Sequence, residues 1–212
     1  MLNADKPSDE ELVRLVQQGE KPVFATLVRR HERRVYWIIH GILENHADSE
    51  EVLQETFLKA LQHIREFRGE SRFSTWLVQI AVNEARMRRR KYRSGLYDSL
   101  DEERDPDSPF RPRELADWRP NPEEEFVREE LSELIQRAIR SLPKNYREVF
   151  LLRDGEHLSS EEAANVLQIS IPAVKTRLLR ARLMMREFLA PHLKLRWHDR
   201  MLARIQRRGR SV

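Results

Sequence analysis

The sequence predicts an all-α fold of two small helical domains joined by a flexible, acidic, proline-rich linker. Apolar residues recur at helical spacing along most of the chain, and no run alternates apolar and polar residues as a half-buried strand would. Five of the ten prolines stand between residues 94 and 125, and 98–125 holds eleven acids against four arginines, a net charge of −7. Proline at this density prevents regular helix, and the charge opposes collapse.

The length and composition of the chain indicate how many domains it holds and exclude several classes of protein. The 212 residues suffice for two domains with a small core each, and we place these domains at 1–93 and 126–189, with the linker at 94–125 and a basic tail at 190–212. The absence of cysteine excludes disulfides and thiolate chemistry and suits a reducing compartment. The N-terminus is acidic rather than signal-like, and the longest nearly apolar run, 35–43, is far shorter than the ~18 residues of a membrane helix. We therefore expect a cytoplasmic protein without membrane insertion.

Capping residues and helical spacing define the elements of the first domain. Ser8 and Glu11 fit a capping box before a short amphipathic helix. Further helices are expected at about 24–42 and 75–93. Between them a third helix opens near Asp48. It is predicted to bury Leu53, Phe57, Leu61 and Ile64, and its opposite face carries Glu51, Glu55, Lys59 and Gln62.

The clearest motif lies in the second domain. Ser159 and Glu162 predict a capping box for the short helix SEEAANVL, the turn QIS follows, and Ser170 can cap a second helix with Pro172 in its first turn. Two short helices, a tight turn and small alanines at the crossing are typical of a helix-turn-helix. Gln168 stands at the turn position that glycine often holds, where a left-handed backbone would cost about 1 kcal/mol.

The second of these helices would present two contrasting faces. At ~100° per residue, the face expected to be buried consists of Val174, Leu178, Ala181 and Met185. The opposite face carries Thr176, Leu179, Arg180 and Leu183, flanked by Lys175 and Arg182. An outward leucine among cations fits a DNA major groove, where Leu can contact a thymine methyl and Arg or Lys can reach guanine. The alternative is an ordinary amphipathic helix of a bundle, with arginines for solubility.

Cations crowd the end of the fourth helix. In EARMRRRKYR, residues 84–93, six of the last eight residues are Arg or Lys. The helix dipole favours one or two cations at this end, whereas a polyanion accounts for six, because each phosphate contact releases counterions. Just before this helix, Phe73 and Trp76 lie beside Arg72, which suits stacking on unpaired bases. The alternatives are core positions for the aromatics and a solvated helix end for the cations.

Three segments carry a resemblance to a known family. They are DSEEVLQETFLKAL at 48–61, FRGESRFSTWLVQIAVNEARMRRRK at 67–91 and LPKNYREVFLLRDGEHLSSEEAANVLQISIPAVKTRLLRAR at 142–182. In this order they resemble a bacterial RNA polymerase sigma factor of the extracytoplasmic-function (ECF) class of the sigma-70 family, over about 20–93 and 126–189. The resemblance implies a protein that binds core RNA polymerase, directs it to specific promoters and helps open the DNA, with no catalytic residue, cofactor or metal of its own.

The resemblance also assigns a partner to each set of residues. The set that would dock on the coiled coil of the largest polymerase subunit is Asp48, Glu51, Gln54, Glu55 and Leu58. The set that would open and read the start-proximal promoter element as a single strand is Arg72, Phe73, Ser74, Trp76, Asn83, Arg86 and Arg90. The set that would contact the upstream element in duplex form is Ser170, Lys175, Thr176, Arg177, Leu179, Arg180 and Arg182. An anti-sigma factor is a further expected partner, because the family often has one.

Other functional classes explain fewer of these features. A free-standing helix-turn-helix transcription regulator would leave the acidic stripe at 48–61 and Asn83 unexplained. A helical RNA-binding protein would fit the aromatics and arginines but not the helix-turn-helix. An enzyme is disfavoured because the chain holds no H-E-x-x-H and no glycine-rich phosphate loop, and its seven histidines are scattered. The long acidic linker and the basic tail depart from the family pattern and could pair with each other in the free protein.

Overall fold

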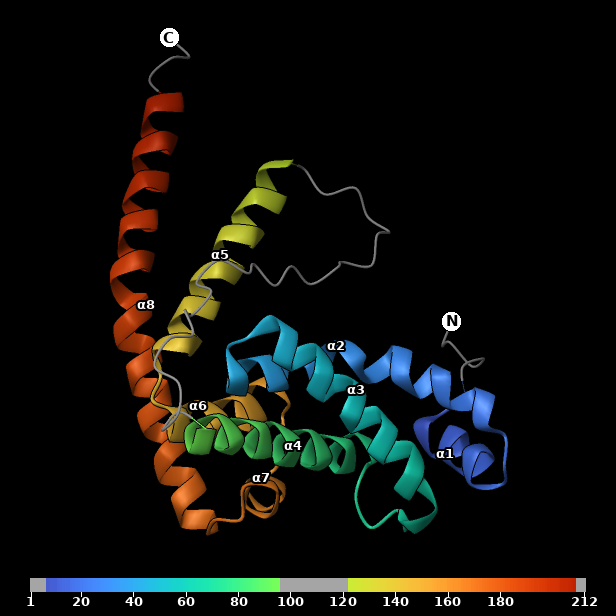
Figure 1. Ribbon diagram of the computed structural model, residues 1–212. Coiled ribbons are helices and arrows are strands. Elements are labelled where there is room, and N and C mark those ends of the chain that lie inside the picture. The colour runs from blue at the N-terminus through green and yellow to red at the C-terminus, as the bar shows by residue number, and fades with distance from the viewer. Residues whose placement is uncertain (1–6, 96–121, 209–212) are drawn as a thin grey trace.

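The computed structural model describes residues 7–95 and 122–208, with side chains placed in 7–92 and 130–192. The regular elements in these ranges are all helical, which confirms the predicted fold class. Most of the predicted linker, 96–121, lies outside the described residues. In Figure 1 the helices before this gap lie beside those that follow it, and one long helix, coloured orange to red, extends away from both.

The first domain has the helices that its capping residues predict. In chain order they are α1 (Asp9–Gln17), η1 (Lys21–Val23), α2 (Phe24–Leu43), α3 (His46–His63), η2 (Ile64–Glu66) and α4 (Phe73–Gly95). The capping box before α1 is present: the Ser8 hydroxyl accepts from the backbone N–H of Glu11 at 3.2 Å, and the Glu11 carboxylate accepts from the backbone N–H of Ser8 at 2.7 Å. α3 begins earlier than expected, because the Asn45 side chain accepts a hydrogen bond from the backbone N–H of Asp48 at 3.0 Å and caps it.

α3 buries a somewhat different face from the predicted one. Phe57 is buried, as is Ile64 just past the helix in η2, but Leu53 and Leu61 are only half-buried. The other residues that it buries are small or medium-sized: Ser49, Val52, Thr56 and Ala60. α3 packs against both α2 and α4, and small side chains allow neighbouring helix backbones to approach closely. The spacing of apolar residues along α3 therefore identified its inner face only in part.

The second domain consists of α5 (Pro122–Ser141), α6 (Lys144–Phe150), the π-helical turn η3 (Leu151–Gly155), α7 (Ser160–Leu167) and α8 (Ile171–Arg208). Two boundaries differ from the prediction. α5 begins inside the predicted linker, because a proline such as Pro122 fits the first turn of a helix without losing a hydrogen bond. α8 continues without a break past residue 189, with Pro191 inside it, so the predicted tail is helical as far as Arg208.

The two domains share a hydrophobic core, where the sequence predicts a small core for each. One cluster of buried side chains joins Ile39 and Val82 of the first domain to Val149, Leu152 and Leu167 of the second. α2 packs against α6 and η3, and α4 packs against α7. Each small domain alone would leave part of its apolar surface in water, and burying it jointly is favourable by about 25 cal/mol per Å².

Candidate nucleic-acid and protein interfaces

α7 and α8 form the predicted helix-turn-helix. The Ser159 hydroxyl accepts from the backbone N–H of Glu162 at 3.0 Å, and the Glu162 carboxylate accepts from the backbone N–H of Ser159 at 2.7 Å, so the capping box is confirmed. Gln168 ends α7 in the left-handed conformation, with φ 54° and ψ 47°. The Ser170 hydroxyl accepts from the backbone N–H of Ala173 at 3.3 Å at the start of α8. These contacts define the turn between the two helices.

α8 has the two faces that the angular spacing predicts. The residues buried on its inner side are Val174, Leu178, Ala181 and Met185. Its outer side exposes Lys175, Thr176, Leu179 and Arg180, and 61% of the surface of Leu179 is accessible. An apolar side chain this exposed, among cations and a hydroxyl, is available for contact with a partner.

Two neighbouring side chains hold the arginines of this outer face. Arg180 donates a hydrogen bond to the Tyr146 hydroxyl at 3.2 Å, which raises the pKa of the guanidinium. Arg182 binds both carboxylate oxygens of Asp154, at 2.9 and 2.6 Å, and this pairing raises the pKa of Arg182. A phosphate at Arg182 would have to displace Asp154. Sequence reasoning missed Tyr146 and Asp154, because they precede the helix-turn-helix and reach it only through folding.

The outward face of α3 carries the residues predicted to dock on a protein partner. It exposes Glu51, Gln54, Glu55 and Leu58, with Asp48 half-buried at its N-terminal end. Leu58 is 57% exposed, beside the carboxylates. An exposed leucine next to acids fits a protein surface that offers both an apolar contact and basic side chains.

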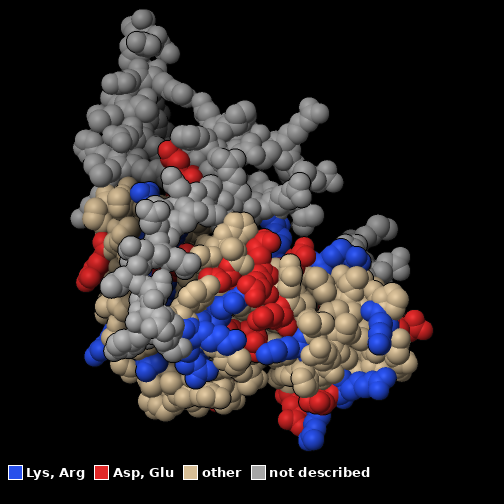
Figure 2. All heavy atoms as spheres, viewed as in Figure 1, with Lys and Arg blue, Asp and Glu red and all other residues tan. Residues whose placement is uncertain are grey.

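The end of α4 lies against the first turns of this acidic face. Arg88 pairs with Glu51 and with Asp48, the latter at 3.6 Å, and the Tyr92 hydroxyl donates to Asp48 at 2.8 Å. Figure 2 shows acidic and basic side chains gathered side by side on this face of the molecule. Glu55 is exposed and, among the described contacts, stands outside this cluster. Of the predicted docking residues, Glu55 is therefore the acid that can be changed with the least effect on α4.

Comparison with known proteins decides the family. Residues 27–95 match Sigma-70 region 2, and residues 132–185 match Sigma-70, region 4. The chain is 33% identical over 196 residues to the ECF RNA polymerase sigma-E factor of Haemophilus influenzae, a match that covers 89% of this chain and 98% of that protein. This chain belongs to the ECF class of sigma-70 factors. It is an RNA polymerase sigma factor that directs promoter-specific transcription, in a family of transcription initiation factors rather than enzymes.

Other relatives agree with this assignment. The sigma factor is 32% identical over 186 residues to the RNA polymerase sigma-H factor of Pseudomonas aeruginosa, covering 88% of this chain and 96% of that protein. Its structure is similar to that of CnrH in complex with the cytosolic domain of CnrY, with a TM-score of 0.59, 25% identity and coverage of 86% and 97% of the two chains. RpoE from Bartonella quintana, in complex with the anti-sigma factor NepR, shares the fold with a TM-score of 0.63 at 22% identity, over 79% and 96% of the two chains.

One predicted DNA contact of the sigma factor belongs to its core. Phe73 is only 1% exposed, and its ring lies edge-on to His31 and to Phe67, with centroids 5.6 and 6.0 Å away. The prediction that Phe73 stacks on an unpaired base is therefore wrong for this structure, and the alternative of a core position holds. Its neighbour Arg72 is exposed and Ser74 is half-buried.

Trp76 and Asn83 meet at a hollow of about 350 Å³ between α3 and α4. Lys59 and His63 of α3 line the same hollow, and the Lys59 ammonium pairs with Glu84 of α4 at 2.7 Å. An aromatic ring and an amide at one opening can stack on and hydrogen-bond to a base, and the carboxylates of Glu66 and Glu84 line the opening as well. The sequence predicts Trp76 and Asn83 as DNA contacts, but it gave no signal for Lys59, which the packing of α3 on α4 brings there.

Three of the six cations at the end of α4 bind acids of the same chain. Arg86 and Arg89 both pair with Glu148 of α6, at 2.5 and 2.8 Å, and Arg88 pairs with the acids of α3. Arg90 is exposed. In this conformation Arg86, Arg88 and Arg89 therefore face acids of the same chain, and the expectation that the cluster faces DNA phosphates stays a prediction. Glu148 is a single acid in an apolar stretch some sixty positions later, which the sequence pattern does not connect to α4.

Neither a metal centre nor a membrane span is found in the described part of the chain. No group of three or more His, Cys, Asp or Glu side chains in these ranges is arranged to hold an ion. The helices there that are long enough to cross a bilayer are not apolar enough to do so. The buried His31 bonds to Asp9 at 2.7 Å, as expected for a structural histidine.

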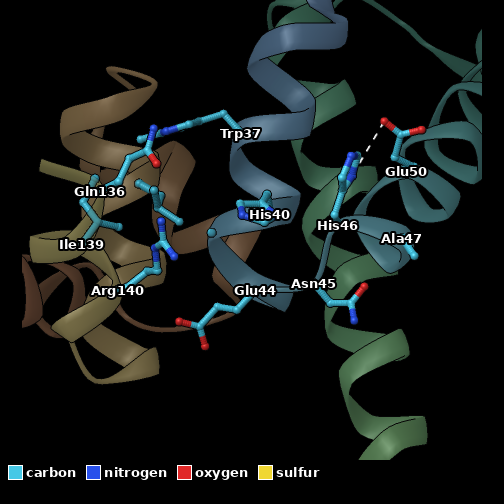
Figure 3. A pocket seen from close by; sticks show the side chains of 12 residues that line it. Trp37, His40, Glu44, Asn45, His46, Ala47, Glu50, Gln136, Ile139 and Arg140 are labelled. Carbon is cyan, nitrogen blue, oxygen red and sulfur yellow. Dashed lines mark ion pairs between the residues drawn. The ribbon is translucent and has the colours of Figure 1, made fainter. Parts of the chain in front are cut away.

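A second hollow, of about 450 Å³, opens where α2 meets α5. In Figure 3 Trp37 and His40 of α2 lie opposite Ile139 and Arg140 of α5. Burial lowers the pKa of His40, and the nearby charges of Arg140 and His46 act in the same direction.

Acidification is expected to destabilise the protein through His40. The pKa of His40 in the folded chain lies below the ordinary value of 6.5, so the unfolded chain binds the proton first as the pH falls. The free energy of unfolding is therefore unaffected by His40 well above pH 6.5 and decreases below it. His40→Asn should reduce the loss of stability between pH 7.5 and 5.5, measured by urea denaturation. An unchanged pH dependence in this variant would contradict the assignment.

Proposed function

We propose that this sigma factor docks on core RNA polymerase through α3, reads the upstream promoter element with α8 and opens the start-proximal element at the hollow between α3 and α4. The observation that carries the proposal is the outer face of α8. There a helix-turn-helix presents Lys175, Thr176, Leu179 and Arg180 to solvent, while the opposite face of the same helix is buried. This combination is suited to a major groove, where cations reach guanine and leucine reaches the thymine methyl.

The predicted domain assignments become part of the proposal. Residues 1–93 would act as the polymerase-docking and DNA-opening domain, 126–189 as the upstream-element domain and 94–125 as the connection. Because the two domains are tethered, binding of the second to DNA is intramolecular once the first is bound, which raises its effective concentration. The polymerase would fix the spacing between them.

Opening of the start-proximal element requires binding energy rather than catalysis. A site that binds unstacked bases better than paired ones shifts the equilibrium of the duplex toward the open form. Trp76 and Asn83 at the hollow, with Arg72 and Arg90 exposed on α4 and the loop before it, supply stacking, a hydrogen-bonding amide and positive charge. Ser170 and Arg177 would add phosphate contacts for the upstream domain.

The proposed partners are core polymerase, promoter DNA and an anti-sigma factor, all in the cytoplasm. The contact on polymerase would be the coiled coil of its largest subunit, which Glu51, Gln54, Glu55 and Leu58 would meet. Support for an anti-sigma partner comes from RpoE of Bartonella quintana, which was solved in complex with the anti-sigma factor NepR.

Arg180→Ala tests the reading of duplex DNA by α8. We expect it to weaken binding of the polymerase holoenzyme to its upstream element about tenfold, and to relax the preference at a single base pair, because one bidentate base contact is lost. The measurement is a competition assay with upstream elements substituted one position at a time. Arg137→Ala, an exposed arginine on α5, is the matched control. An equal loss of affinity for all sequences would make Arg180 a phosphate contact instead.

A further inference from the structure

The surfaces through which the two domains meet have the character of a protein interior. Buried apolar side chains of α2 and α4 belong to the same cluster as those of α6, η3 and α7. If the domains separated, water would reach the apolar cluster that contains Val149, Leu152 and Leu167, because the first domain no longer covered it. Contiguous apolar surface on a soluble protein marks a place that is covered by a partner, and here each domain covers the other.

Two glycines, one from each domain, allow this close approach. A Cβ atom on Gly155 of η3 would lie 2.2 Å from the indole ring of Trp37 on α2. A Cβ atom on Gly41 of α2 would lie 2.5 Å from the side chain of Leu151 on η3. Glycine inside a helix costs about 1 kcal/mol relative to alanine, so Gly41 has a cost within its own domain, and the space that it leaves is taken by Leu151 of the other domain.

Two consecutive buried residues of α6, with opposite charges, both bind across the same contact. The Glu148 side chain is 4% exposed and pairs with Arg86 and Arg89 of α4, at 2.5 and 2.8 Å. Arg147 pairs with Glu44 at 2.6 Å and donates to the carbonyl of Gly41 at 3.3 Å, at the end of α2. A buried charge without a partner is strongly unfavourable, so these two residues favour the arrangement in which the domains are together.

Further polar contacts cross the same contact surface. Glu156, also with 4% of its side chain exposed, binds Arg34 of α2 at 2.5 Å. Thr75 of α4 donates to Glu162 at 3.0 Å, and Arg86 donates to the carbonyl of Leu167 at 3.1 Å, at the end of α7. Arg86 thus pairs with an acid of the other domain and also donates a hydrogen bond to a carbonyl at the end of one of that domain's helices.

We propose that the free sigma factor holds its two domains together, in a closed arrangement whose central contact is Glu148 with Arg86 and Arg89, and that DNA phosphates and Glu148 compete for these two arginines. The competition rests on the proposed function of α4, whereas the closed arrangement does not. A phosphate that approaches either guanidinium competes with the Glu148 carboxylate for its positive charge and its N–H groups. Binding of DNA to α4 and closure of the domains therefore oppose each other, and each weakens the other by the same factor.

Closure is tested by energy transfer in the full-length chain. Because the chain contains no cysteine, Gln62→Cys on α3 and Glu187→Cys on α8 provide two unique labelling sites, both exposed. Glu148→Arg places a third cation against Arg86 and Arg89, and Gly155→Leu inserts a side chain against Trp37 without changing any charge. We expect both to lower the transfer efficiency. Glu133→Arg makes the same charge change on the exposed side of α5 and should leave it unchanged.

Exchanging the charges of the two arginines and Glu148 provides a second test of closure that does not depend on any single variant. The triple variant Arg86→Glu, Arg89→Glu, Glu148→Arg restores the attraction with reversed signs, and we expect it to recover transfer relative to Glu148→Arg. Circular dichroism of each variant reports whether its helices are retained. If Gly155→Leu does not fold, the comparison of Glu148→Arg with the triple variant decides. Equal transfer in wild type, Glu148→Arg and every other folded variant would overturn the closed arrangement.

Competition is tested by the affinity of the same proteins for fluorescein-labelled dT20. Gly155→Leu retains every cation, so tighter binding would come from cations released by opening, such as Arg86 and Arg89, and not from added charge. We expect about fivefold or more, the lower end of the coupling typical of linked sites. Glu148→Arg should gain more than Glu133→Arg, which controls for added charge. A fall in transfer without a gain in affinity would overturn the competition alone. Co-elution with core polymerase reports on the proposed function separately from both measurements.

Discussion

Glu55→Arg is expected to abolish co-elution of the sigma factor with core RNA polymerase while leaving the fold intact. Glu55 lies on the outward face of α3, exposed, beside Leu58, and stands outside the cluster that joins Asp48 and Glu51 to α4. Reversing its charge places a cation against the basic surface that this face is proposed to meet. Like charges brought together at an interface cost several kcal/mol, enough to reduce affinity by several orders of magnitude. Size exclusion of the purified chain with core polymerase gives the measurement.

The control for this experiment is Glu32→Arg, which makes the same charge change on the exposed side of α2. It should co-elute with polymerase as the wild type does. Retained co-elution of Glu55→Arg would show that α3 does not contact polymerase through this residue. Retained DNA binding without any co-elution of the wild type would instead favour a free-standing regulator.

Arg147→Leu is expected to destabilise the chain by about 3 kcal/mol. The guanidinium of Arg147 is buried and donates to backbone carbonyls at the ends of two helices: those of Arg140, Leu142 and Gly41. It also pairs with Glu44 at 2.6 Å. Leucine fills a similar space but leaves these acceptors without their donor, and an unsatisfied buried acceptor costs about 1–3 kcal/mol. The midpoint and slope of urea denaturation measure the change.

Arg137→Leu removes the same charge from an exposed position of α5 and should change stability by less than about 0.5 kcal/mol. If the two variants lose equal stability, the carbonyl contacts of Arg147 contribute nothing beyond its charge. A larger loss of stability for Arg147→Leu would show that the hydrogen bonds of Arg147 stabilise the contact between the ends of α2 and α5.

Local features of this protein were predictable from its sequence. The capping boxes at Ser8 and Ser159 appear where the pattern predicts them, and Gln168 at the turn adopts the left-handed conformation that was considered for it. The inner and outer faces of α8 also agree with the prediction. Caps and helix faces depend on residues three or four positions apart, so short-range spacing suffices to predict them.

Contacts between distant segments were not predictable in this way. The spacing of α3 suggested an inner face lined by Leu53, Phe57, Leu61 and Ile64. Phe57 and Ile64 are buried, but the packing on α2 and α4 selected small residues in place of the two leucines. The position of Phe73 in the core was one of two alternatives that the sequence could not separate. Both the inner face of α3 and the burial of Phe73 depended on which other helix packed against them.

The sequence by itself determined the helix-turn-helix, the family and most of the helices, but not where α5 begins or where α8 ends. Only the tertiary structure decided where the cations of α4 point. An arginine at the end of a helix can bind a phosphate or a carboxylate equally well by its chemistry. Glu148, buried on another domain, takes Arg86 and Arg89 in this conformation. Spacing along one helix carries no information about an acid that folding brings from more than fifty residues away.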